Sequence, residues 1–233
     1  MLILTERLSH TLSHLPKGQV ALFLPDSPLL DPRVCFHTDL RVFAHKRRII
    51  CAPSVYGILK EKLPLSVLLT SGKTEPEGAY PKEVPYNGVA VGRFLIANPD
   101  NLSGDVLDYA KAAGLTLIPV KQGYCRCNVT VVSDTEGKEA VITEDKGIAS
   151  AAQKQGVEVL LLPHGGVSLE GWDNGFIGGA SVTTADSVLF FGDLALHPEG
   201  GRIAEFCLTH GKTPLSLISG VPLSDCGGGV WIE

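Results

Sequence analysis

Apolar and polar residues alternate along the chain in five similar blocks. Each block contains an apolar run that ends in a polar turn, and the last apolar residues of these runs are Leu4, Ile50, Ile96, Ile142 and Phe191. The first three steps between them are of 46 residues each, and the fourth is of 49. The 42 residues after Phe191 and the first four residues again make 46, so the period continues across the two ends of the chain. A closed ring of five units has this property.

A helical pattern follows each turn, and a second apolar run follows each helical pattern. The clearest helical patterns, GDVLDYAKAAG and GGRIAEFCLTHG, end on glycine, as helices commonly do. The continuous apolar runs favour strands that are covered on both faces. The sequence predicts helices over residues 5–15, 54–63, 103–113, 146–155 and 200–210, and strands over 19–24, 65–70, 115–120, 157–163 and 213–218.

A junction of small polar residues comes after each of these strands, and a further strand and a hairpin lead to the next block. In the last block the returning strand is missing, and residues 1–4 would supply it by pairing with a strand over 229–232. We therefore predict one domain over residues 1–233, an α/β fold that forms a five-bladed propeller of units of about 46 residues. Pairing of the N- and C-terminal strands would close the ring. A doubly wound α/β sheet with chance spacing is the alternative.

Composition narrows the class of protein. Of 233 residues, 44% are hydrophobic and 19% charged, which suits a large core and argues against disorder. The net charge of −5 disfavours generic nucleic-acid binding. The one basic cluster, residues 45–48, is interpreted as an exposed hairpin turn, with phosphate binding as the alternative. No signal-peptide pattern and no apolar membrane span are found, so we expect a cytoplasmic protein with free thiols and no membrane contact.

A five-unit α/β ring of this length resembles the penteins, the superfamily of guanidino-group-modifying enzymes. The segments GFIGGAS, LFFGDL and DCGGG are similar to a bacterial branch of that superfamily. The resemblance covers the whole chain and rests on architecture. It implies either hydrolysis of a guanidino compound or, as in the ribosome anti-association factor, binding without catalysis. In the enzymes of this superfamily a thiolate attacks the guanidinium carbon, a histidine transfers protons, and carboxylates hold the cation.

Two motif positions depart from the pattern of these enzymes. Their cysteine follows Gly-Gly-Gly-x-x near the C-terminus, but here GGGVW at 227–231 is followed by Ile232. Their histidine lies in Gly-His-x-Asp at the fourth junction, but here the nearest match is GWDN at 171–174. The resemblance therefore argues against standard deiminase chemistry, and it leaves Asp173 as a candidate catalytic acid.

The remaining candidate catalytic residues are Cys226 and His164. Cys226 lies on a glycine-flanked turn, where Arg126 or Arg33 from other junctions could lower its pKa and the adjacent Asp225 would raise it. His164 follows a buried strand near the mouth of the ring, where it could act as acid or base. The alternative for Cys226 is an inert, buried thiol on a tight turn.

Acidic, amide and basic side chains recur at equivalent junctions, which a closed ring would bring to one axis. They could bind a cationic or polyhydroxy ligand there, or simply cap the turns. We expect a divergent hydrolase or small-ligand binder that acts in a polar central channel on a cationic or guanidino-type compound. A non-catalytic binding protein on the same ring is the alternative. The predicted substrate-binding residues are Asp31, Arg33, Asn87, Arg126, Asn128, Asn174 and Asp225.

Two cysteine-containing segments complete the candidate chemistry. CFHTD at 35–39 would place Cys35, His37 and Asp39 on one face of a strand as a thiol–base pair, or would be a plain strand that runs into a hairpin. In CRC at 125–127 the spacing is wrong for a zinc knuckle, and strand alternation would put both cysteines on one face. We therefore predict no metal and no cofactor, and the sequence leaves the oligomeric state open.

Overall fold

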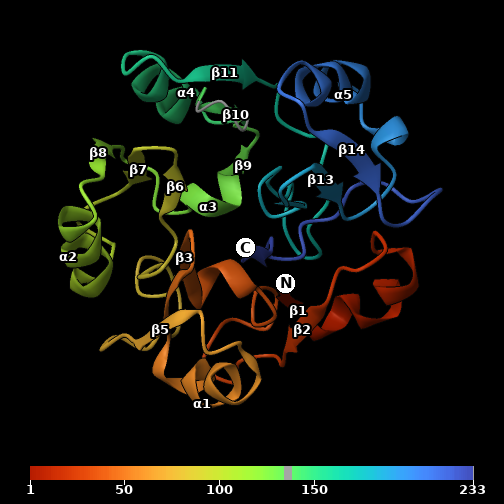
Figure 1. Ribbon diagram of the computed structural model, residues 1–233. Coiled ribbons are helices and arrows are strands. Elements are labelled where there is room, and N and C mark those ends of the chain that lie inside the picture. Colours follow the sequence, from red (N-terminus) through yellow and green to blue (C-terminus); the bar gives the residue numbers. More distant parts are fainter. Residues whose placement is uncertain (134–137, 233) are drawn as a thin grey trace.

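Five small three-stranded sheets surround a central axis in the computed structural model, which describes residues 1–133 and 138–232 (Figure 1). Every sheet has the same order. A middle strand pairs antiparallel with an inner strand and parallel with an outer strand. This arrangement is the predicted five-bladed α/β propeller, and it excludes one doubly wound sheet.

The middle strands form the buried part of each unit. Their third residues are Leu4, Ile50, Ile96, Ile142 and Leu189, so the steps are 46, 46, 46 and 47 residues. Phe191, the last apolar residue of the fifth run, lies one residue beyond the paired strand and continues its buried apolar run. The middle strands are β1 (Leu2–Thr5), β4 (Arg48–Cys51), β7 (Phe94–Ala97), β10 (Ala140–Thr143) and β13 (Ser187–Phe190).

The outer strands lie at the edge of each sheet. The prediction that they are covered on both faces was wrong, since Leu68 remains 55% exposed and Leu117 and Leu161 are each 37% exposed. A helix of the same unit packs against most of these strands, but their outer edge has no partner strand. The outer strands are β2 (Ala21–Leu24), β5 (Leu68–Ser71), β8 (Thr116–Pro119), β11 (Glu158–Leu161) and β14 (Thr213–Ser216).

The helices occur where the helical pattern predicts them. Ser103 and Asp145 cap two of them by accepting hydrogen bonds from the backbone N–H groups of Val106 and Ile148. The first helix is 3₁₀ rather than α. The predicted helices are η1 (Glu6–His14), α1 (Pro53–Lys62), α2 (Gly104–Ala112), α4 (Lys146–Gln153) and α5 (Gly200–Thr209), and the shorter ones are η2 (Thr38–Leu40), α3 (Cys125–Asn128) and η3 (Leu194–Leu196). No helix of the described residues is long and apolar enough to cross a membrane.

Both ends of the chain contribute to the first sheet, as predicted. β15 (Val230–Trp231) pairs antiparallel with β1, with Leu2 opposite Trp231 and Ile3 opposite Val230. The terminal amino group donates a hydrogen bond of 2.8 Å to the carbonyl of Ile232. Figure 1 shows the two ends side by side near the axis of the ring. The pairing therefore joins the first and last units.

Inner strands line the central channel, which holds only about 120 Å³. Its walls are mostly small or apolar side chains such as Val42, Ala90 and Val131, and the half-buried Arg126 lies at its wall. Arg126 and Thr183 contribute polar groups to the same lining, and the expectation of a polar central channel stays a prediction. The inner strands besides β15 are β3 (Val42–His45), β6 (Val89–Val91), β9 (Val129–Val131) and β12 (Ser181–Thr183).

The glycine run before β15 lets the last junction pass very close to the first. Gly227 and Gly228 have φ values of +77° and +59°, which glycine adopts readily. A Cβ on Gly227 would lie 2.2 Å from the Cα of His37. The Asp39 N–H also donates to the carbonyl of Gly227 at 3.0 Å. The glycines thus place the last junction directly against His37 and Asp39.

Candidate functional site

Polar side chains from four junctions meet at one end of the ring. The inner strands occupy equivalent positions, so the junctions that precede them lie at the same end. His37 and Asp39 come before β3, Asn87 before β6, Cys127 before β9 and Asp225 before β15. All five residues are at most 2% exposed, so they form one buried polar cluster.

His37 lies between two carboxylates. Its Nδ1 is 3.7 Å from Asp39 Oδ1, and its Nε2 is 3.6 Å from Asp225 Oδ1. The Asp225 oxygens accept hydrogen bonds of 3.0 Å from the backbone N–H groups of Gly227 and Phe176. Among the described residues, His37 Nε2 has no hydrogen-bond partner, and the Asp39 oxygens have none except a contact with the thiol of Cys127. Buried polar groups normally have full partners, so these atoms mark the cluster as a candidate site.

Asn87 holds Cys127 in place. The Asn87 Oδ1 accepts hydrogen bonds from the N–H groups of Arg126 at 2.8 Å and of Cys127 at 3.3 Å. Its Nδ2 donates to the Asp39 carbonyl at 3.0 Å and lies 3.2 Å from the Cys127 sulfur. Burial, and then the carboxylates of Asp39 and Asp225, raise the pKa of Cys127 well above its ordinary value. The thiol of Cys127 is therefore neutral unless a cation binds beside it.

Arg126 provides the cation of the cluster. Its guanidinium donates hydrogen bonds to the carbonyls of Val129 and Gly178, both at 3.1 Å, and of Gly229 at 2.8 Å. Burial lowers its pKa, and the nearby Asp39 and Asp225 oppose that effect. Arg126 therefore ties the backbones of neighbouring units together and offsets one of the two buried negative charges.

A pocket of about 540 Å³ lies above this cluster, and Asp225 and Cys226 are part of its lining. The rim carries Arg7, Arg33 and Glu170. Each arginine already has a carboxylate of its own, because Arg7 contacts Asp26 at 2.7 Å and Arg33 contacts Asp31 at 2.8 Å. Glu170 and Asp225 are the acids of the lining itself, and burial raises the pKa of Asp225, so the pocket offers charged groups of both signs.

The comparisons with known proteins agree with the fold. The sequence matches the model of a family of unknown function, DUF6873, over residues 5–230. This chain belongs to that family. The search of curated proteins finds no match to the DUF6873 protein.

Solved structures with the pentein fold resemble the DUF6873 protein. DDAH from Pseudomonas aeruginosa, in a mutant complexed with citrulline, is 11% identical with a TM-score of 0.54, and the match covers 91% of this chain and 80% of that one. A dimethylarginine dimethylaminohydrolase adduct is 12% identical with a TM-score of 0.53 and coverages of 93% and 91%. Agmatine deiminase from C. jejuni is 11% identical with a TM-score of 0.51 and coverages of 93% and 74%. The DUF6873 protein therefore has the pentein fold.

The residues predicted for binding and catalysis fall into three groups. Asn87, Asn128 and Asp225 are buried at the junctions, Arg126 is half-buried there, and Asp31, Arg33 and Cys226 lie at or beside the pocket. His164, Asp173 and Asn174 are exposed on the turns before β12. The structure thus brings the first two groups to one end of the ring and leaves the third in solvent. The roles of all these residues stay predictions.

The thiol of Cys226 faces the core of the first and last units of the DUF6873 protein. Cys226 packs with the apolar cluster that contains Leu4, Val182 and Trp231. Burial, and then the carboxylate of Asp225, raise its pKa to about 12. The geometry therefore favours the alternative of an inert thiol.

His37, Asp39 and Cys127 were predicted to lie on strands, and this prediction was wrong. Residues 31–40 form turns and η2, and residues 125–128 form α3, so strand alternation does not apply. Cys35 turns away from His37 and donates to the Asp26 carboxylate at 3.4 Å. Their position in the sequence could have identified them as site residues, since His37, Asp39 and Cys127 all stand within a few residues of an inner strand.

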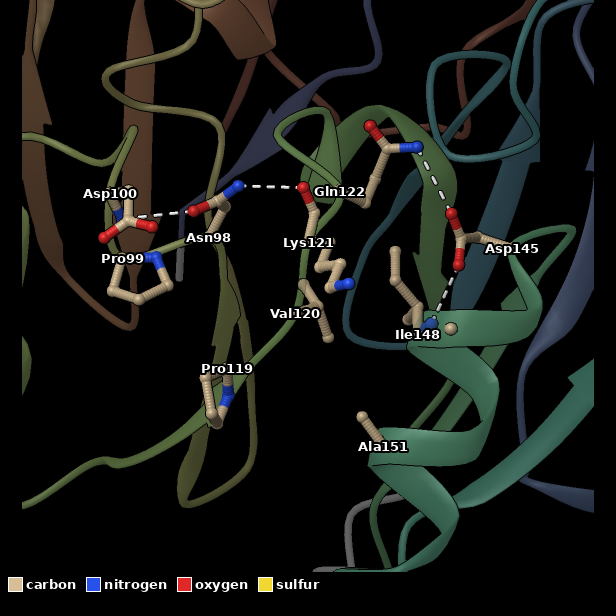
Figure 2. Close-up of a pocket in the computed structure, with 11 residues that line it drawn as sticks. Asn98, Pro99, Asp100, Pro119, Val120, Lys121, Gln122, Asp145, Ile148 and Ala151 are labelled. Atoms are coloured by element: carbon tan, nitrogen blue, oxygen red, sulfur yellow. Dashed lines mark hydrogen bonds between the residues drawn. The ribbon is translucent and has the colours of Figure 1, made fainter.

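A larger pocket of about 920 Å³ lies between the segments that follow β7 and β8 and the first turns of α4. Figure 2 shows that the side chains of Asn98, Gln122 and Asp145 are already bonded to protein groups. Asn98 donates to the Lys121 carbonyl at 2.8 Å, and Gln122 donates at 3.2 Å to Asp145, which caps α4. These side chains have clear structural partners, so the junction cluster is the better candidate site.

Proposed function

We propose that the DUF6873 protein is a divergent hydrolase that acts on a small cationic, guanidino-type compound in the pocket above Asp225. The observation that carries this proposal is His37, held between two buried carboxylates directly beneath a pocket whose lining includes the acids Glu170 and Asp225. Acid–base groups with perturbed environments mark catalytic sites more often than structural ones.

The residues of the cluster suggest how such a reaction would run. Asp225, at the floor of the pocket, takes the proton of a water that attacks the planar carbon of the substrate. The carbon–nitrogen bond then breaks, and the proton passes to the leaving nitrogen. His37 lies 3.6 Å from Asp225 and would stabilise the negative charge of its carboxylate. Water is the nucleophile in this scheme because raised pKa values keep Cys226 and Cys127 as neutral thiols.

The fold supports the substrate class. The pentein structures most useful for comparison are described as DDAH complexed with citrulline and as agmatine deiminase. Both names refer to guanidino compounds or their products. At identities of 11% the likeness extends to the fold, so the choice of substrate for this chain rests on the acids Glu170 and Asp225 of the pocket together with that fold.

The experiment is a thermal-shift and product assay with arginine, N-methylated arginines and agmatine, with ornithine and putrescine as controls that lack a guanidinium. A substrate should raise the melting temperature by mass action and release ammonia or an amine. Asp225→Asn should abolish the release of product, and Asp108→Asn, on the exposed side of α2, should leave it unchanged. No shift and no product with any guanidino compound would refute the proposal.

A non-catalytic binding protein is the second candidate, and the state of the thiols favours it. Neither Cys226 nor Cys127 has the lowered pKa of an activated nucleophile. A non-catalytic binding protein would show, in the same assay, a rise in melting temperature without any product. That outcome would assign the pocket to ligand binding alone.

A further inference from the structure

We infer that the DUF6873 protein binds a zinc ion through His37, Asp39 and Cys127. One ligand atom of each residue lies within 4.8 Å of the other two, and all three side chains are buried. Zinc prefers imidazole nitrogen, carboxylate oxygen and thiolate sulfur at about 2.0–2.3 Å, which puts its ligand atoms roughly 3.3–3.8 Å apart. A contraction of about 1 Å would therefore bring all three atoms to zinc-ligand distances, with the fourth position of the tetrahedron open.

The carboxylate of Asp39 is the observation that points to a cation. Asp39 is 0% exposed, and among the described residues its oxygens have no hydrogen-bond partner except a contact with the neutral thiol of Cys127. The backbone of Asp39 is fully engaged, since its N–H donates to Gly227 and its carbonyl accepts from Asn87. A buried carboxylate with only a weak thiol donor is costly, and a metal ion is a partner that removes this cost.

The surroundings of the three residues match those of a metal centre. If His37 Nδ1, which faces Asp39, binds the metal, then Nε2 faces Asp225 at 3.6 Å. A carboxylate on the second nitrogen is the usual way in which proteins orient a metal-bound histidine. On the other side, the Asn87 Nδ2 lies 3.2 Å from the Cys127 sulfur, where it would stabilise a thiolate. Both outer partners are thus already in place.

Charge balance agrees with a divalent ion. With Cys127 as a thiolate, the cluster would contain three negative groups, namely Cys127, Asp39 and Asp225. Arg126 offsets one of them, and a zinc ion would offset the other two. Binding would release the thiol proton of Cys127 to solvent as the sulfur–zinc bond forms, so charge and atoms balance. The mixed nitrogen, oxygen and sulfur donors favour zinc over magnesium or calcium.

The test is a cobalt titration of protein that has first been dialysed against EDTA and then freed of the chelator. Cobalt is the probe because it takes the place of zinc and gives a thiolate-to-metal charge-transfer band in the near ultraviolet. We expect one cobalt ion per chain, this band, and loss of the band when one equivalent of zinc is added. Cys127→Ser should abolish the band, whereas Cys226→Ser, at the neighbouring junction, should retain it.

Two further variants keep the test decisive if Cys127→Ser does not fold. Asp39→Asn preserves the shape of a ligand but removes its charge, and it should weaken cobalt binding at least about tenfold while the band survives at saturating metal. Asp225→Asn should weaken binding by about 10–100-fold through the orientation of His37. Absence of the band in the wild-type protein, or its loss in Cys226→Ser but not in Cys127→Ser, would overturn the inference.

The zinc site goes beyond the proposed hydrolase and is tested separately from it. The cobalt titration needs no substrate, and the product assay can be repeated on EDTA-treated and on zinc-loaded protein. Turnover without a cobalt band would remove the metal site and retain the hydrolase. A cobalt band without turnover or ligand binding would retain the metal site and remove the hydrolase.

Discussion

Gly227 tests how tightly the last junction must close over the candidate site. Gly227→Ala adds a Cβ that would lie 2.2 Å from His37 Cα and 2.6 Å from His37 Cγ. The residue also has a φ of +77°, where an L side chain costs about 1–2 kcal/mol. Gly220→Ala is a matched control in the same unit, because its φ is +76° and no atom lies within 4 Å of the added Cβ. The control isolates the backbone strain from the collision with His37.

We expect Gly220→Ala to lose about 1 kcal/mol of unfolding free energy and Gly227→Ala to lose about 3 kcal/mol or more. The difference arises because overpacking against a backbone atom forces the junction apart, and overpacking typically costs about 1–3 kcal/mol beyond any strain. Urea unfolding followed by tryptophan fluorescence measures both variants. Equal losses in the two variants would refute the close approach of the last junction to His37.

Two further predictions concern Glu144 and the terminal strand. Burial raises the pKa of Glu144 from 4.5 to about 7, so the folded state keeps a proton that the unfolded state loses. Unfolding free energy should therefore fall by up to about 3 kcal/mol as pH rises from 4.5 through 7. Glu144→Gln should lack this loss in parallel urea titrations, and identical pH profiles would contradict the raised pKa. Removal of residues 230–233 deletes β15, so cooperative thermal unfolding should disappear; an unchanged melting temperature would contradict closure of the first sheet.

The sequence was sufficient to predict the architecture because the period of the apolar runs is a property of each buried middle strand. The third residues of four middle strands, from Leu4 to Ile142, stand where the pattern predicts them. The pattern was less informative about the outer strands. Leu68 belongs to a continuous apolar run but remains 55% exposed, because hydrophobicity along a strand does not reveal whether a second layer covers it.

The candidate site was predicted only in part, and local geometry explains the difference. Asn87 and Asp225 were found because equivalent junctions of a ring must converge. Cys127 was missed as a site residue because its segment forms a helical turn, in which strand alternation no longer sets the direction of side chains. Asp173 and His164 were expected at the same place, but their longer junction leaves them exposed.

The charge of the buried cluster links the two proposals. Asp39 and Asp225 bring two potential negative charges, while Arg126 brings one positive charge and already directs its donors to backbone carbonyls. The buried Arg41 also acts on the charge of Asp39 and donates to the carbonyls of Pro25 and His37. A cationic substrate above Asp225 and a zinc ion beside Asp39 would each bring further positive charge to the same buried group of residues. We therefore expect that, if both bind, each weakens the binding of the other to the same extent.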